Sequence, residues 1–238
     1  YHRWITELDQ RRQALHFQFA EIDREYHNLW SFDWLPLDEQ RAFILHLSLI
    51  LPDYWIARGD FMREGIALIE EGLNSDSIDP QLRIHAMIML GKLRFHVGLI
   101  NENTLTGIRE AYDRSKALNH PLLTGLALNE LECLLAGVGK FEEARTHLYE
   151  MIDLYESLPD PVKDKAHFKQ VISRAYTNLG VTSLQVGDFD IAEEYALKGI
   201  EINISENDDV GLEVGYNTLG IIHLEQGELD EAHDYFLK

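Results

Sequence analysis

A glycine followed two residues later by a large apolar side chain recurs five times along the chain at nearly constant spacing. The glycines are Gly59, Gly98, Gly139, Gly187 and Gly227, and the steps between them are 39, 41, 48 and 40 residues. A fixed period in this range is typical of stacked supersecondary units, each of which buries its apolar face against its neighbours. We therefore expect an all-α solenoid, an architecture that usually binds other molecules and rarely catalyses a reaction.

The last two repeats match each other at an offset of 40 residues. One contains Tyr176, Leu179-Gly180, Gly187-Asp188-Phe189, Ala192 and Tyr195, and the other contains Tyr216, Leu219-Gly220, Gly227-Glu228-Leu229, Ala232 and Tyr235. Gly180 lacks a side chain, so we expect two helices to approach closely there. Gly187 suits a left-handed cap at the end of the first helix. We expect the same of Gly220 and Gly227.

The order aromatic, Leu-Gly, Gly-acidic-apolar, Ala, aromatic resembles the tetratricopeptide repeat (TPR) family. The resemblance extends over roughly residues 42–238 and weakens toward the N-terminus. It implies a right-handed superhelix of antiparallel helix pairs. We therefore expect an N-terminal helical cap region at residues 1–37 and about five TPR-like repeats at 38–238. Because the chain starts at Tyr1 and stops inside a repeat at Lys238, we expect a fragment of a longer protein.

Composition excludes several functions. The net charge is −20, from 41 acidic and 21 basic residues, which disfavours binding to nucleic acid and permits a basic partner. No run of 18 apolar residues occurs, so we expect no membrane span. The single cysteine, Cys133, excludes an intrachain disulfide and fits a reducing cytoplasm.

Motifs that carry catalysis are missing from the sequence. There is no phosphate-binding G-x-x-x-x-G-K-[ST] loop and no H-E-x-x-H zinc motif. His85 and His96 are eleven residues apart on one expected helix, which separates them by about 16 Å and prevents them from sharing a metal ion. We therefore expect no catalytic residues, no metal site and no cofactor.

The start of the repeats carries a second resemblance. The pattern E-x-x-N-L followed by W-x-x-R-G-x-x-x-x-E-G is similar to the junction found in bacterial STAND-class signal-transduction ATPases and transcriptional activators. The matching residues are Glu25, Asn28, Leu29, Trp55, Arg58, Gly59, Glu64 and Gly65. The resemblance implies a C-terminal sensor region whose ATPase and output domains lie outside this chain.

In the TPR family the first helix of each repeat lines a concave groove. Carried over, this implies groove-facing His85, Lys92, Phe95 and His96, then Asn129 and Cys133, then Arg174, Thr177 and Gln185, and finally Asn217, with apolar Val181, Leu184, Val214 and Ile221 on the same faces. Small side chains in the third repeat would widen the groove, and Lys92 and Arg174 would flank that space. Apolar walls with a few polar anchors suit a ligand site. The alternative is that these positions only pack across a tight superhelix.

The leading hypothesis is a non-enzymatic sensor or interaction module that binds a peptide, a protein or a small effector and regulates a larger signalling protein. One alternative is a structural adaptor that self-associates and scaffolds partners. Another is a TPR regulator of phosphotransfer, similar to the peptide-controlled response-regulator phosphatases. The lysine clamp of chaperone-binding TPRs is not reproduced, because Leu49, Ile88 and Asn129 occupy its first lysine position.

The C-terminal repeat suggests an additional contact. We expect Leu229, Ala232, Tyr235 and Phe236 to lack the cover that a following repeat would supply. Exposed apolar patches promote association. A homodimer through this repeat is therefore a further hypothesis.

Overall fold

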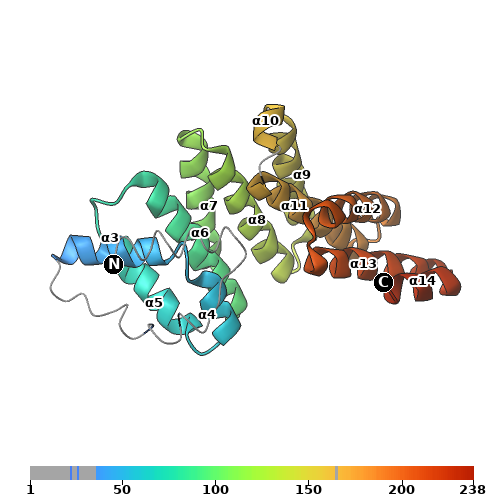
Figure 1. Ribbon diagram of the computed structural model, residues 1–238, viewed down its shortest axis with the longest axis horizontal. Coiled ribbons are helices and arrows are strands. Elements are labelled where there is room, and N and C mark those ends of the chain that lie inside the picture. The colour runs from blue at the N-terminus through green and yellow to red at the C-terminus, as the bar shows by residue number, and fades with distance from the viewer. Residues whose placement is uncertain (1–21, 23–25, 27–35, 164–165) are drawn as a thin grey trace. The chain divides into compact units, whose positions relative to one another are not determined.

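The computed structural model describes Ile22, Tyr26 and residues 36–163 and 166–238 (Figure 1). All regular secondary structure in these residues is helical, which confirms the expected all-α class. Most of the expected cap region at 1–37 lies outside the described residues. The chain divides into two compact units, Tyr1–Arg114 and Ser115–Lys238.

The first unit is built around helix α5 (Met62–Leu73). Its other helices are α3 (Leu37–Leu47), α4 (Pro52–Arg58), α6 (Pro80–His96) and α7 (Glu102–Ala117), the last of which continues into the second unit. Helix α5 packs against α3, α4 and α6. Proline occupies the first turn of α4 and α6, where its missing N–H group is not needed. The Asp79 side chain caps α6 by accepting hydrogen bonds from the backbone of Gln81 and Leu82.

The second unit contains three helix pairs. They are α8 (Pro121–Gly137) with α9 (Phe141–Glu156), α11 (Ala166–Gln185) with α12 (Phe189–Glu206), and α13 (Asp209–Gln226) with α14 (Leu229–Phe236). The one-turn helix α10 (Asp160–Lys163) lies between the first two pairs. This insertion accounts for the longest glycine interval in the sequence, 48 residues. Helix α11 packs against both α8 and α13, so it is central to the unit.

Two kinds of glycine build the repeats. The five periodic glycines all have positive φ, between 62° and 82°, and a Cβ on any of them would meet no atom within 4 Å. They are therefore required by backbone conformation, as expected for Gly187 and Gly227. At Gly180, in contrast, a Cβ would lie 3.2 Å from the Ala192 carbonyl oxygen, and at Gly220 it would lie 2.4 Å from the Phe236 ring. These two glycines are required by close helix packing, which confirms the expected close approach of two helices at Gly180 and Gly220.

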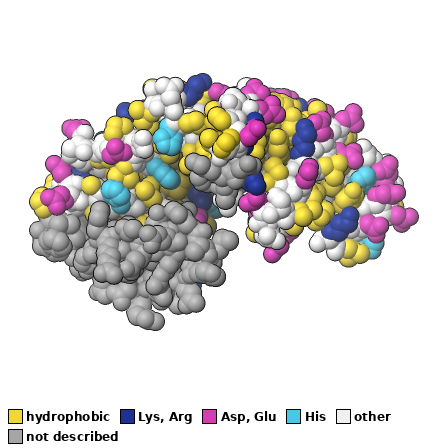
Figure 2. Space-filling view, turned by 45° about the horizontal axis from the view of Figure 1, so that its top comes forward, with side chains coloured by type: hydrophobic (Ala, Val, Ile, Leu, Met, Phe, Trp, Pro, Cys, Tyr) yellow, Lys and Arg dark blue, Asp and Glu magenta, His cyan; other side chains and the backbone are white. Residues whose placement is uncertain are grey.

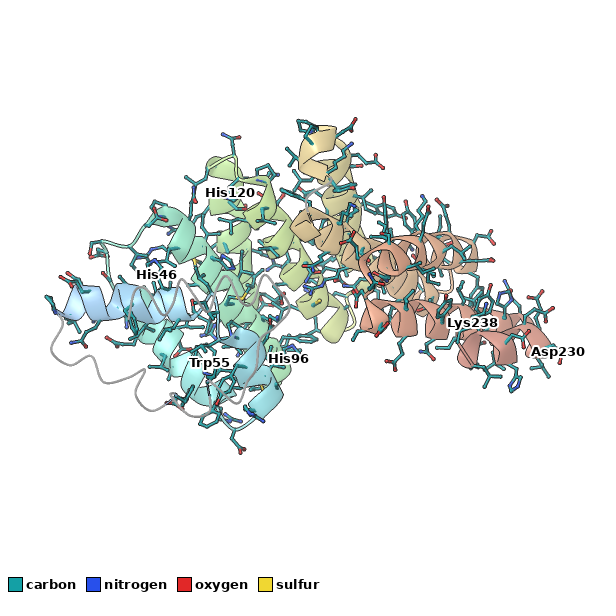
Figure 3. The ribbon with its side chains drawn as sticks, viewed as in Figure 1. His46, Trp55, His96, His120, Asp230 and Lys238 are labelled. Atoms are coloured by element: carbon teal, nitrogen blue, oxygen red, sulfur yellow. The ribbon has the colours of Figure 1, made fainter. Side chains whose placement is uncertain are left out.

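Trp55 organises the first unit (Figure 3). Its side chain is fully buried, and its indole Nε1 donates a hydrogen bond of 3.0 Å to the Tyr26 hydroxyl. A Cβ on Gly65 would lie 2.6 Å from the Trp55 ring, so the glycine lets α5 approach α4. The Tyr26 ring packs against Phe61 with centroids 4.5 Å apart. The matched tryptophan and glycine of the junction motif thus have a packing role, whereas Glu25, Asn28 and Leu29 lie outside the described residues.

Candidate binding surface

One face of α11 carries polar and apolar side chains that are exposed or half-buried. Arg174, Asn178, Val181 and Gln185 follow one another at steps of four, three and four residues, which places them on one side of the helix. Arg174 and Gln185 are exposed, and the other two are half-buried. Because α11 packs against both α8 and α13, this face borders residues of α8 on one edge and residues of α13 on the other.

Toward α8, the face of α11 meets a buried carboxylate. Glu132 is only 3% exposed, and its Oε2 accepts hydrogen bonds from Asn178 Nδ2 at 2.8 Å and from the Cys133 thiol at 3.4 Å. Burial raises the pKa of Glu132 to about 7, and the charge of Glu130 also raises it, while the hydrogen bonds from Asn178 and Cys133 lower it. Burial likewise raises the pKa of the Cys133 thiol. Glu132 therefore changes its charge near neutral pH.

Asn129 lies one turn before Cys133 on α8 and is 7% exposed. Its Nδ2 donates a hydrogen bond of 3.3 Å to Glu130. Its Oδ1 is buried and accepts no hydrogen bond from any described residue. A buried polar atom without a partner is uncommon in folded proteins and needs an explanation.

Toward α13, the face of α11 borders an open groove of about 720 Å³. Its apolar lining comes from Val181 and Leu184 of α11, Leu212, Val214 and Ile221 of α13, and Phe236 of α14. Its polar lining includes Gln185 and Asn217, together with the acidic Asp209 and Glu213. The groove therefore combines apolar walls with amide and carboxylate groups.

Two tyrosine–lysine stacks recur 40 residues apart. Lys238 Nζ lies 4.3 Å from the Tyr235 ring centroid and 5.5 Å from that of Tyr216, and these residues line the groove. Lys198 lies 4.5 Å from Tyr195 and 5.9 Å from Tyr176 in the preceding repeat. Each lysine thus contacts one tyrosine from each helix of its own pair, where a cation over a ring is stabilising.

The C-terminal repeat differs in part from the expectation. Leu229 and Phe236 are 65% and 47% exposed, as expected. Ala232 is buried, and the Tyr235 ring stacks on Tyr216 and His223. The expectation that Ala232 lacks cover is therefore wrong, because its own repeat already buries it, whereas Tyr235 is half-buried and keeps part of its surface exposed.

The residues expected in the groove fall into three groups. Asn129, Cys133 and Arg174 lie together on α8 and α11, and Gln185 and Asn217 lie together in the open groove. His85, Lys92, Phe95 and His96 belong to α6 in the first unit.

Lys92 already has a partner, since its Nζ lies 2.8 Å from Asp53 Oδ1. Phe95 and His96 form an edge-to-face pair with ring centroids 5.7 Å apart, and burial, followed by the charge of Lys92, lowers the pKa of His96. His85 is half-buried. Thr177 is buried beside Gly199 of α12 and so faces its own helix pair rather than the groove.

Sequence reasoning missed Glu132 and Asn178. Both lie beside a residue assigned to the groove, Cys133 and Thr177 respectively, and neither was assigned to it. A signal for Glu132 was present, because this carboxylate interrupts the leucine-rich stretch from Leu131 to Leu135. A charged residue inside an apolar helix is rarely fully buried without a partner.

The described residues contain no cluster of His, Cys, Asp and Glu side chains that could hold a metal ion. No helix among them is both long enough and apolar enough to cross a membrane.

Comparisons with known proteins agree with this architecture. A tetratricopeptide repeat family model matches residues 173–203, which include most of α11 and α12. None of the curated proteins matches the sequence.

Several solved structures are similar in fold. BtubC (BKLC) from P. vanneervenii is 19% identical with a TM-score of 0.67, over 92% of this chain and 86% of that one. The apo form of RapI is 11% identical with a TM-score of 0.66, over 99% and 94%. A Rap protein complexed with competence and sporulation factor is 16% identical with a TM-score of 0.68, over 97% and 60%. The family match and these structures together support a protein built from TPR-like repeats.

Proposed function

We propose that the chain is a non-enzymatic interaction module and that it binds an extended segment of a peptide or protein along α11. The observation that carries the proposal is the single face formed by Arg174, Asn178, Val181 and Gln185. This face borders a polar cluster on α8 and a groove of about 720 Å³ toward α13. A volume of roughly 300–1,000 Å³ with apolar walls and a few polar groups is typical of ligand sites.

The regulatory part of the proposal rests on similarity. The junction residues around Trp55 resemble those that precede sensor repeats in STAND-class proteins. A Rap protein of similar fold holds competence and sporulation factor. We infer that binding on α11 regulates a larger signalling protein in the cytoplasm. A small effector in the same groove is the other ligand class that this volume can accommodate.

The test uses a phage-displayed library of random twelve-residue peptides, selected on the immobilised 238-residue chain. Val181→Glu places a charge in the apolar wall of the groove and should abolish binding of the enriched peptides. Leu197→Glu is the matched control, because Leu197 is 48% exposed on α12 and does not line the groove. No enrichment, or equal loss in both variants, would contradict the proposal.

Self-association is a second candidate role, favoured by the exposure of Leu229 and Phe236. An adaptor that scaffolds partners through a homodimer would use this apolar surface. Sedimentation velocity over a hundredfold range of protein concentration distinguishes the two roles. A monomer at every concentration excludes the adaptor and leaves the peptide-binding proposal intact.

A further inference from the structure

We propose that Glu132 and Asn129 form a subsite for the side chain of a basic residue, arginine in the first place, carried by a peptide bound along α11. This inference rests on the proposed function, since it assumes that a peptide lies on that helix. It adds the chemistry of the partner. The subsite lies within the second unit, where α8 meets α11.

The groups at this place supply acceptors for a cation. Glu132 presents a carboxylate that is 3% exposed, and Glu130, the next acidic residue on α8, is 8% exposed. Among the described residues, Glu132 has only neutral hydrogen-bond partners, the amide of Asn178 and the thiol of Cys133. No described residue forms an ion pair with Glu132 or donates to its Oε1. Isolated buried carboxylates are costly unless they are paired.

Asn129 gives an independent indication of a missing donor. Asn129 is only 7% exposed. Its Nδ2 donates a hydrogen bond to Glu130, and its Oδ1 accepts none from the described residues. Asn129 and Glu132 are three residues apart on α8, so they lie on the same side of the helix, one turn from each other. A ligand that brings several N–H donors could donate to Asn129 Oδ1 and to the Glu132 carboxylate at the same time.

Arginine fits these requirements better than other side chains. Its guanidinium has five N–H donors and no acceptor, so it can donate to the carboxylate and to the amide oxygen together. An anionic group would be repelled by Glu132 and Glu130. An apolar group would leave the Asn129 oxygen without a donor.

Arg174 is the basic residue whose charge acts on this cluster. Its charge lowers the pKa of Cys133, although burial and the two glutamates dominate and raise it. Arg174 is exposed and forms no ion pair with the described residues. It therefore competes with an incoming cation only as a solvent-screened charge. Glu130 and Cys133 on α8 are the titratable groups that influence the ionisation of Glu132, and Arg174 on α11 acts on the neighbouring Cys133.

The charge of the second unit favours a basic partner over longer distances. Residues 115–238 contain 23 acidic and 9 basic residues, so they carry a net charge of −14 out of the −20 of the whole chain. Figure 2 shows Asp and Glu side chains gathered over the C-terminal helices. A field of one sign raises the association rate of an oppositely charged ligand.

The test compares arginine with citrulline, which has nearly the same shape and no charge. Two bead-bound nonapeptide libraries carry either residue at the fifth position and random residues elsewhere, and each is incubated with the fluorescently labelled 238-residue chain at pH 8. Binding peptides are resynthesised in both forms. Exchange of arginine for citrulline should weaken binding about 10- to 100-fold, the range expected for a buried hydrogen bond to a charged group.

Variants locate the effect. Glu132→Gln should reduce the arginine–citrulline difference to less than about threefold, because the neutral amide gives no ion pair. Glu201→Gln, which removes an exposed carboxylate of α12 that does not line the groove, should leave the difference intact. Arg174→Gln should strengthen binding of the arginine peptide. In the wild-type chain the difference should shrink between pH 8 and pH 6, as Glu132 takes up a proton. This arm needs no variant to fold.

The outcomes separate the two proposals. Peptides that bind equally well with arginine and citrulline would overturn the subsite and leave peptide binding in place. A citrulline effect that survives Glu132→Gln would assign the arginine to another carboxylate and also overturn it. Two libraries without any binding peptide would overturn the proposed function itself.

Discussion

Replacing Glu132 by glutamine should make the protein more stable at alkaline pH. The pKa of this carboxyl is raised from 4.5 to about 7 in the folded chain, chiefly by burial. At 1.36 kcal/mol per pKa unit, this shift corresponds to about 3 kcal/mol of destabilisation when the group is fully ionised. Glutamine is neutral and its Oε1 can still accept the hydrogen bond from Asn178. We therefore expect the free energy of unfolding to rise by up to about 3 kcal/mol above pH 8.

The sign of the pH dependence is the stronger part of this prediction. Below the unfolded pKa, the carboxyl is protonated in both states and contributes no difference. As the pH rises from 4.5 through about 7, the unfolded chain loses its proton first, so the wild-type chain loses stability. The advantage of Glu132→Gln should therefore be near zero at pH 4.5 and reach its maximum above pH 8.

The assay is urea unfolding followed by circular dichroism at pH 5, 7 and 9. Because repeat stacks can unfold in parts, amide hydrogen exchange in α8 and α11 should accompany it. Glu213→Gln is the control, since Glu213 is an exposed carboxylate. A Glu132→Gln variant that is less stable than wild type at every pH would refute the reasoning.

Three further predictions test the packing and the assembly. Gly180→Ala should destabilise the second unit by about 1–3 kcal/mol in thermal unfolding, because the new methyl would lie 3.2 Å from backbone atoms of α12. Gly107→Ala is the control, because a methyl at this position of α7 meets no atom within 4 Å. It should stabilise the protein by about 0.5–1 kcal/mol. Gly187→Ala should cost about 1 kcal/mol through its φ of 79° alone, and Gly187→Asn should cost less in the same assay; equal costs would contradict a conformational role. Phe236→Glu should abolish any concentration-dependent association seen by light scattering, and association that persists would place the contact elsewhere.

The helix pairs could be predicted because the signals are local. A positive φ at Gly187 and a close approach at Gly180 each depend on one short segment and on the helix that follows it. The period between such glycines then defines the stack. The one interval of 48 residues coincides with the insertion of α10, which the repeat pattern did not predict.

The polar cluster could not be predicted, because it depends on the register between two helices. Glu132 and Asn178 are 46 residues apart in the chain and meet only when α8 and α11 are aligned. That alignment is a matter of long-range packing, for which the repeat pattern in the sequence carries no direct signal. The positional rule of the family placed Cys133 and Arg174 near the surface that we propose for binding. It placed Thr177 on that surface as well, although this side chain packs against Gly199.

The central claim is that a peptide binds along α11, and side-chain amide NMR tests it most directly. A nonapeptide selected from the arginine library is titrated into the ¹⁵N-labelled 238-residue chain. The NH₂ resonances of Asn178, Gln185 and Asn217 should shift with one common saturation curve, while that of Asn207, which ends α12 in a left-handed conformation, should not. Shifts confined to Asn207 or to residues of the first unit would contradict the claim.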